Sequence, residues 1–133
     1  SKKHWIFTVN NAVVLSGDIG TGGISTDNSF HTVYSNSSDT IHIKGITIAH
    51  GNSNGLVEEQ TKGGGIYNQV NLKLSDCRIE NNQSTQAGNG IYNASDAFLI
   101  INNSMIQNNT GSDTEIFIDN NGTLKSEGVI LKD

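Results

Sequence analysis

The sequence predicts an all-β fold, a single-stranded right-handed parallel β-helix of about four to five coils with about 25 residues in each. Three observations lead to this fold class. A short phrase recurs at a fixed interval, apolar residues alternate with polar ones at the period of a strand, and the intervening segments carry glycine and asparagine but no proline. Because one coil cannot bury its own apolar face, neighbouring coils must supply matching inward residues, which explains the repetition.

The repeated phrase sets the length of a coil. Residues 63–68 read GGGIYN and residues 88–93 read GNGIYN, so Ile66 and Ile91 are 25 positions apart. Ile116, in the phrase IFI, follows at the same interval. Two equal intervals indicate a solenoid repeat.

An insertion lengthens the step between the first two coils. Val33, in the phrase VYS, lies 33 positions before Ile66, and the excess of eight matches the polar, charged segment GLVEEQTK at 55–62. We expect this segment to be a surface loop, and long insertions on one face of a solenoid often carry binding.

Three segments align as the strands of successive coils, namely IHIKGITIAHGN (41–52), LKLSDCRIENNQ (72–83) and LIINNSMIQNN (99–109). Their apolar–polar alternation has the period of a strand, and no stretch combines helix caps with an apolar stripe. The alignment predicts four inward columns: Ile41, Leu72 and Leu99; Ile43, Leu74 and Ile101; Ile46, Cys77 and Ser104; and Ile48, Ile79 and Ile106.

Asparagine is expected at the corners of the coils. The chain has 18 asparagines, and adjacent pairs occur at 81–82, 102–103, 108–109 and 120–121. Asparagine tolerates a left-handed backbone, and its amide can bond to the asparagine of the next coil in a ladder. The absence of proline leaves every backbone donor available for strand pairing.

Composition excludes several classes of function. The 133 residues fit one domain, and the net charge of −5 with Arg78 as the single arginine argues against a nucleic-acid partner. No run approaches the roughly 20 apolar residues of a membrane-spanning helix. Cys77 is the only cysteine, so no disulfide can form within the chain, and the spacings of the histidines do not match a metal motif.

GGGIYN, followed by an apolar strand and CRIENN, resembles the glycine-rich and Phe-x-x-Asn-like repeats of polymorphic outer membrane proteins, with isoleucine in place of phenylalanine at Ile79 and Ile106. Residues 14–55 also look like the segment that leads into such repeats in secreted β-helix proteins of the pectin-lyase-like superfamily. The resemblance implies a stalk or passenger domain, extracellular or at a bacterial cell surface and often part of a larger chain. It implies no particular activity.

A row of aromatic residues is the first candidate for binding. If Val33, Ile66, Ile91 and Ile116 point inward, the residues that follow them point outward and stack on one another. Such a row either stabilises the coils or offers a platform for a sugar or a docking stripe for a protein. Its members are Tyr34, Tyr67, Tyr92 and Phe117.

The segment GDIGTGGISTDNS offers the second candidate. Asp18 and Asp27 could form the carboxylate pair of a polysaccharide lyase or glycoside hydrolase, or a calcium site. The competing interpretation is that both carboxylates cap turns in their own loop, since Arg78, the single arginine, belongs to a different coil. No other cofactor is expected.

These observations favour a non-catalytic structural or adhesive β-helix module over a carbohydrate-binding or carbohydrate-cleaving one that uses the Asp18–Asp27 region. Residues 1–133 are expected to form one domain and to be a fragment of a longer protein, because neither end has an obvious polar cap. The partners expected are a carbohydrate, a surface protein, or another copy stacked end to end.

Overall fold

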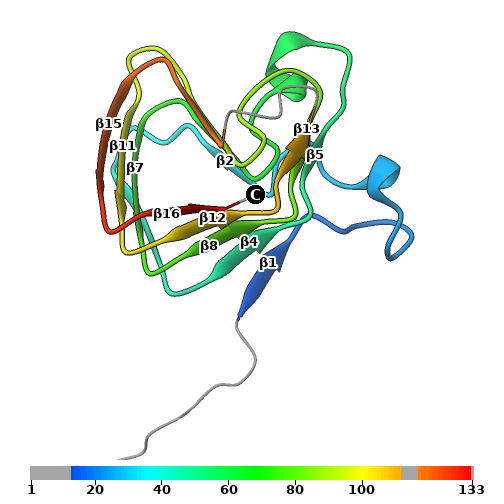
Figure 1. Ribbon diagram of the computed structural model, residues 1–133. Coiled ribbons are helices and arrows are strands. Elements are labelled where there is room, and N and C mark those ends of the chain that lie inside the picture. Colours follow the sequence, from blue (N-terminus) through cyan, green and yellow to red (C-terminus); the bar gives the residue numbers. More distant parts are fainter. Residues whose placement is uncertain (1–12, 112–116, 133) are drawn as a thin grey trace, which may run out of the picture.

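Four parallel sheets wind into a solenoid in the computed structural model, which describes residues 13–111 and 117–132 (Figure 1). The five-stranded sheet contains β1 (Val14–Ser16), β4 (Thr47–Ala49), β8 (Arg78–Glu80), β12 (Met105–Gln107) and β16 (Ile130–Lys132). The first four-stranded sheet contains β2 (Val33–Ser35), β6 (Ile66–Asn68), β10 (Ile91–Asn93) and β14 (Ile118–Asn120). The second contains β3 (Ile41–Lys44), β7 (Asn71–Ser75), β11 (Phe98–Asn102) and β15 (Thr123–Glu127). The smallest sheet contains β5 (Asn52–Ser53), β9 (Gln83–Ser84) and β13 (Thr110–Gly111).

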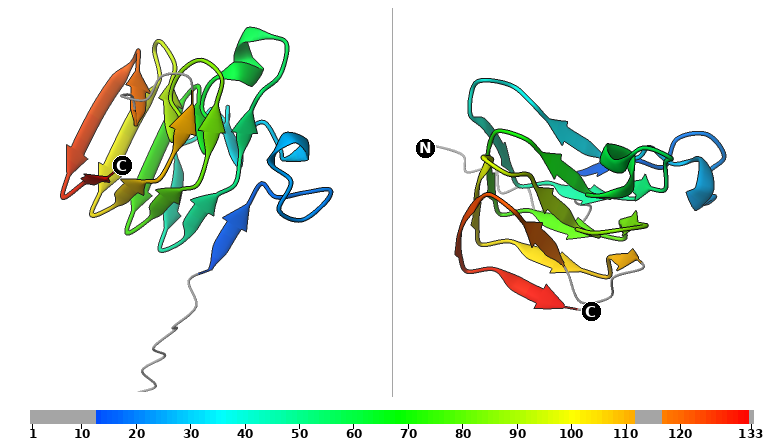
Figure 2. Two further views of the ribbon diagram at one scale, coloured as in Figure 1. Left: turned by 45° about the vertical axis from the view of Figure 1, so that its right-hand side comes forward. Right: turned by 90° about the horizontal axis from the view of Figure 1, so that it is seen from above.

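The described residues form three complete coils, β2–β5, β6–β9 and β10–β13, with β1 before them and β14–β16 after them. Each strand pairs in parallel with the strand at the same place in the next coil, which confirms the predicted parallel β-helix. In Figure 1 the chain passes from β2 to the left-hand sheet of β7, then to β4 below and β5 at the right. In the right-hand view of Figure 2, which is taken from above, the later coils lie on the side from which Figure 1 is seen. The chain in Figure 1 therefore winds counterclockwise while it advances toward the viewer, which makes the solenoid right-handed.

The predicted register of the inner strands is confirmed. Ile41 pairs with Leu72 and Ile43 with Leu74, while Ile79 pairs with Ile106. The predicted step of 25 residues after Ile91 is wrong, because Ile91 pairs with Ile118, which is 27 positions further along the chain. Ile116 lies outside the described residues.

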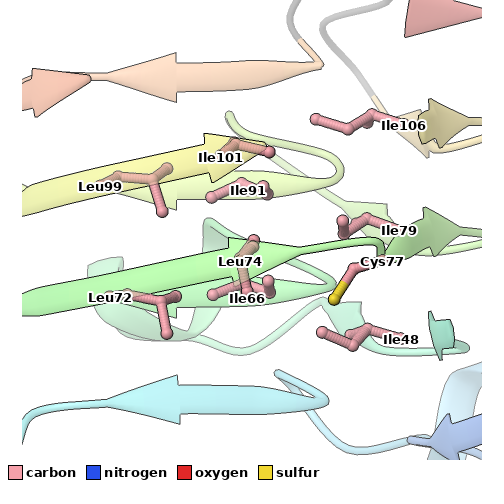
Figure 3. Packing of buried hydrophobic residues seen from close by; sticks show 10 residues of the cluster. All are labelled: Ile48, Ile66, Leu72, Leu74, Cys77, Ile79, Ile91, Leu99, Ile101 and Ile106. Carbon is pink, nitrogen blue, oxygen red and sulfur yellow. The ribbon is translucent and has the colours of Figure 1, made fainter. Parts of the chain in front are cut away.

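The core is a column of apolar side chains between the sheets (Figure 3). Complete burial of an isoleucine or leucine side chain contributes about 1.5–3 kcal/mol, so stacked inward residues supply the main stabilisation of each coil. The buried members are Ile48, Ile66, Leu72, Leu74, Cys77, Ile79, Ile91, Leu99, Ile101 and Ile106.

Asparagine side chains close the corners of the column. Asn68 Nδ2 donates to Asn93 Oδ1 over 2.8 Å, and Asn93 Nδ2 donates to Asn120 Oδ1 over 2.8 Å. Asn68 and Asn93 are fully buried, so each ladder bond satisfies polar groups that would otherwise be costly in the interior. The last residue of each IYN phrase therefore belongs to a ladder that bonds one coil to the next.

Two short 3₁₀-helices lie in the longer loops between strands. The helix η1 (Ser25–Asp27) lies in the loop of residues 17–32, which protrudes beside β5 in Figure 1. The helix η2 (Glu58–Thr61) lies within the eight-residue insertion, where Leu56 is completely exposed.

Candidate binding groove

A polar groove of about 350 Å³ follows one corner of the solenoid, where β4, β8 and β12 turn into β5, β9 and β13. The loop of residues 17–32 forms its other wall at the end nearest β1. We call this feature the corner groove. It is lined by Asp18, Gly23, Ser25, Asn28, His50, Gly51, Asn52, Asn81, Gln83, Asn108 and Thr110.

The corner turns through one left-handed residue in each coil. His50, Asn81 and Asn108 have φ values of 66°, 57° and 54°. They follow residues that pair with one another in neighbouring strands, so they occupy equivalent positions in three coils. Asparagine and histidine are among the residues that tolerate this backbone best, which accounts for their presence there.

The adjacent asparagine of each pair fixes the corner from inside. Asn82 Oδ1 accepts a hydrogen bond from the backbone of Gly51, and Asn82 Nδ2 donates to the carbonyl of Ile48. Asn109 continues the ladder, since its Oδ1 accepts from the backbone of Asn82 over 3.0 Å. The asparagine pairs are therefore divided in role, with one residue making the turn and the next making the ladder.

The loop wall is bonded directly to the first coil. Asn28 Nδ2 donates to the carbonyl of His50 over 2.8 Å, and Asn52 Nδ2 donates to the carbonyl of Ser25 over 2.8 Å. Asn28 Oδ1 is buried and has no hydrogen-bond partner in the part of the chain that the structure describes. A buried acceptor without a partner is unusual in a native protein.

Both candidate carboxylates bond to the backbone of their own loop. The Asp18 carboxylate accepts from the backbone nitrogen of Gly23, with the nearer oxygen at 3.1 Å. Asp27 Oδ2 accepts from the backbone nitrogen of Thr21 over 2.9 Å. Asp18 lines the corner groove, whereas Asp27 is not among its lining residues. Both contacts have the form of turn caps.

One contact in the groove wall was not expected from the sequence. Ser16 Oγ lies 3.1 Å from His50 Nδ1 and also accepts a hydrogen bond from the backbone nitrogen of Asp18. The two residues are 34 positions apart, and only the pairing of β1 with β4 brings them together.

Three members of the predicted aromatic row stack on one another. The ring centroids of Tyr34 and Tyr67 are 5.4 Å apart with an interplanar angle of 23°, and those of Tyr67 and Tyr92 are 4.9 Å apart. His31 joins the row at 5.2 Å from Tyr67. Tyr67, which lies between the other two rings, is only 8% exposed, whereas Tyr34 at the end of the row is 38% exposed.

The placement of Phe117 in this row is wrong. The residue opposite Tyr92 in the next coil is Asp119, and Phe117 packs partly buried against the core. This coil is two residues longer than the predicted interval, so Phe117 lies before β14, the strand that pairs with β10. The row of outward aromatic residues therefore ends at Tyr92 in the described coils.

The insertion lies against the aromatic row. Lys62 Nζ lies 5.1 Å from the centroid of the Tyr92 ring and forms an ion pair with Glu58 over 2.6 Å. Burial, followed by the hydrogen bond that the Tyr34 hydroxyl donates to Glu59, raises the pKa of Tyr34, and burial also raises the pKa of Tyr67. His31 Nδ1 lies 2.9 Å from the carbonyl of Gly63, and burial lowers the pKa of its imidazole.

No group of three or more histidine, cysteine, aspartate or glutamate side chains within residues 13–111 and 117–132 is arranged to hold a metal ion. Cys77 is buried, and its backbone nitrogen donates to Ser104 Oγ, as expected for neighbours in one inward column. Within the same residues no helix is long and apolar enough to cross a membrane.

Comparison with known proteins finds no family model, no curated protein and no solved structure that matches the chain.

Proposed function

We propose that this chain is a non-catalytic structural and adhesive β-helix module of an extracellular or cell-surface protein, with the corner groove as its contact surface. One observation carries the proposal. The candidate carboxylates are engaged by turns of their own loop, whereas the polar side chains left free gather on the outside of one corner across three coils. Free amides on a rigid surface suit recognition, while bond cleavage needs a positioned acid and base.

The architecture supports a spacer that also binds. Every strand of the middle coil, β6–β9, is paired on both sides, and buried asparagines bond each coil to the next. A ladder of this kind resists bending, so the outer faces of the coils keep fixed positions relative to one another. A rigid module of this type can hold a contact surface away from the body that carries it.

The proposed location rests on the repeat pattern. The stacked GGGIYN and GNGIYN phrases resemble those of bacterial surface β-helix proteins, and the confirmed solenoid is the architecture which that resemblance implies. We therefore propose membership of the pectin-lyase-like superfamily and a secreted or surface location in a bacterium.

The test is an adhesion assay with the whole chain immobilised on beads, carried out with and without calcium. Beads are offered polysaccharide coatings, surface glycoproteins and intact cells, while reducing ends released from the polysaccharides are measured in parallel. We expect retention without release. Sugar release that Asp18→Asn or Asp27→Asn abolishes would replace the proposal with a polysaccharide-cleaving enzyme.

A further inference from the structure

Three amide side chains in the corner groove have unused hydrogen-bonding capacity. Within the described residues, the side chains of Asn81, Gln83 and Asn108 have no hydrogen-bond partner. Asn81 and Asn108 are exposed and Gln83 is half-buried. Each primary amide offers two donors and one acceptor oxygen, so the groove presents both kinds of group to a ligand.

These groups repeat along the axis of the solenoid. Asn81 and Asn108 occupy equivalent positions in successive coils, as do Gln83 and Thr110. Neighbouring parallel strands are about 4.8 Å apart, which is close to the length of one sugar residue in an extended chain. A ligand that repeats at the same interval can therefore make the same contact in each coil.

The charge of the groove selects among repeating ligands. Among its lining residues in the described chain, Asp18 is the one acidic residue, and neither lysine nor arginine occurs. The whole chain is also acidic, with a net charge of −5. A polyanion would be repelled, and the described lining has no large apolar side chain that could anchor a hydrophobic peptide.

The groove is preorganised for such a ligand. Its floor is held by the Asn82–Asn109 ladder, and its loop wall is held by Asn28 and Asn52. Little conformational entropy is then lost when a ligand binds.

We propose that the corner groove binds a neutral polysaccharide that lies along the solenoid axis with about one sugar residue for each coil. Asn81 and Asn108 bond to hydroxyl groups of successive sugars, and the Asp18 carboxylate accepts a hydrogen bond from a hydroxyl group at the end nearest β1. This inference rests on the proposed adhesive function and names its ligand class.

The test uses the whole chain and titration calorimetry. Oligosaccharides of neutral hexoses of increasing length are compared with oligouronates of the same lengths. We expect affinity for the neutral series to rise with each sugar until three coils are spanned, and the uronates to bind more weakly. Asn81→Gly and Asn108→Gly remove the amides while keeping the left-handed backbone free of strain, and each should weaken binding roughly 3- to 10-fold.

Asn103→Gly is the matched control. Asn103 also has a positive φ, of 49°, but it lines a separate pocket at the corner between β11 and β12, so its variant should bind like the original chain. The inference is overturned if uronates bind more tightly, if affinity does not grow with length, if the groove variants bind like the control, or if no oligosaccharide binds. Adhesion of the beads to proteins or cells in these cases would leave the proposed function standing, whereas failure of both assays would remove it as well.

Discussion

At the residue scale, neighbouring asparagines have opposite roles. Asn81 makes the left-handed turn and exposes its amide, while Asn82 is fully buried and bonds to Gly51, Ile48 and Asn109. The sequence alone does not distinguish the two residues, because both are asparagine in the same corner. Their difference arises from which side of the backbone each side chain leaves.

Asn82→Ala should therefore destabilise the fold far more than Asn81→Gly. Loss of the Asn82 amide leaves the backbone nitrogen of Gly51 and the carbonyl of Ile48 without this partner, and each buried group costs about 1–3 kcal/mol. We expect a loss of about 2–4 kcal/mol for Asn82→Ala and of less than about 1 kcal/mol for Asn81→Gly. Urea denaturation of both variants checks this, and equal midpoints would contradict the assigned roles.

At the element scale, glycines of the repeated phrase allow adjacent coils to approach closely. A Cβ atom at Gly64 would overlap the backbone carbonyl oxygen of Gln83, and one at Gly65 would lie 2.5 Å from the carbonyl oxygen of Gly90. Backbone cannot move aside as a flexible side chain can. The glycines before IYN are therefore required by the close stacking of coils.

Gly64→Ala should disrupt this contact, and Gly22→Ala provides its control. A Cβ atom at Gly22 would have no neighbour within 4 Å. We expect Gly64→Ala to lower the free energy of unfolding by about 2–3 kcal/mol because neighbouring coils must separate, and Gly22→Ala to change it by less than about 1 kcal/mol. Thermal unfolding followed by circular dichroism distinguishes the two. A Gly64→Ala protein as stable as the control would refute the close approach.

The stability of the fold should respond to pH through His31, which contacts the carbonyl of Gly63. Burial lowers the pKa of His31 below its usual 6.5, so the unfolded chain takes up a proton at higher pH than the folded chain does. The resulting loss in the free energy of unfolding is absent well above pH 6.5. It grows as the pH falls through that value toward the lower pKa of His31 in the folded state. Stability should therefore decline from pH 7.5 to pH 5.

Denaturation of His31→Gln at both pH values isolates this contribution. The free energy of unfolding of His31→Gln should fall less between pH 7.5 and pH 5 than that of the original chain. His42→Gln, at an exposed position outside the aromatic row, should show the same fall as the original chain. An unchanged decline in His31→Gln would show that another group is responsible.

At the scale of the whole molecule, stability should be highest in the middle coil. The strands β6, β7 and β8 are paired on both sides, whereas β1, β3 and β16 lie at sheet edges within the described residues. In a solenoid each coil is stabilised only by its neighbours, so opening begins at the edges. The molecule should behave as a stack that loosens from its ends.

Amide hydrogen exchange measures this gradient. Protection should be strongest for β6–β8 and β10–β12 and should fall toward β1 and β14–β16, because the edge strands have fewer inter-coil bonds to break. Leu74→Ala, in the buried centre, should lower protection in the coils on both sides of it. Uniform protection across all strands would instead indicate one cooperative unit.

The sequence by itself determined the solenoid, its inward columns and the register from Ile41 to Ile106, because strand period and repeat length are recorded in the order of residues. The tertiary structure decided the features that depend on how many residues each coil contains and on which coils meet. Two extra residues placed Asp119 rather than Phe117 opposite Tyr92, and the pairing of β1 with β4 brought Ser16 to His50. The corner groove belongs to this second class, because its residues come from three coils and a loop that meet only when the chain has wound past itself.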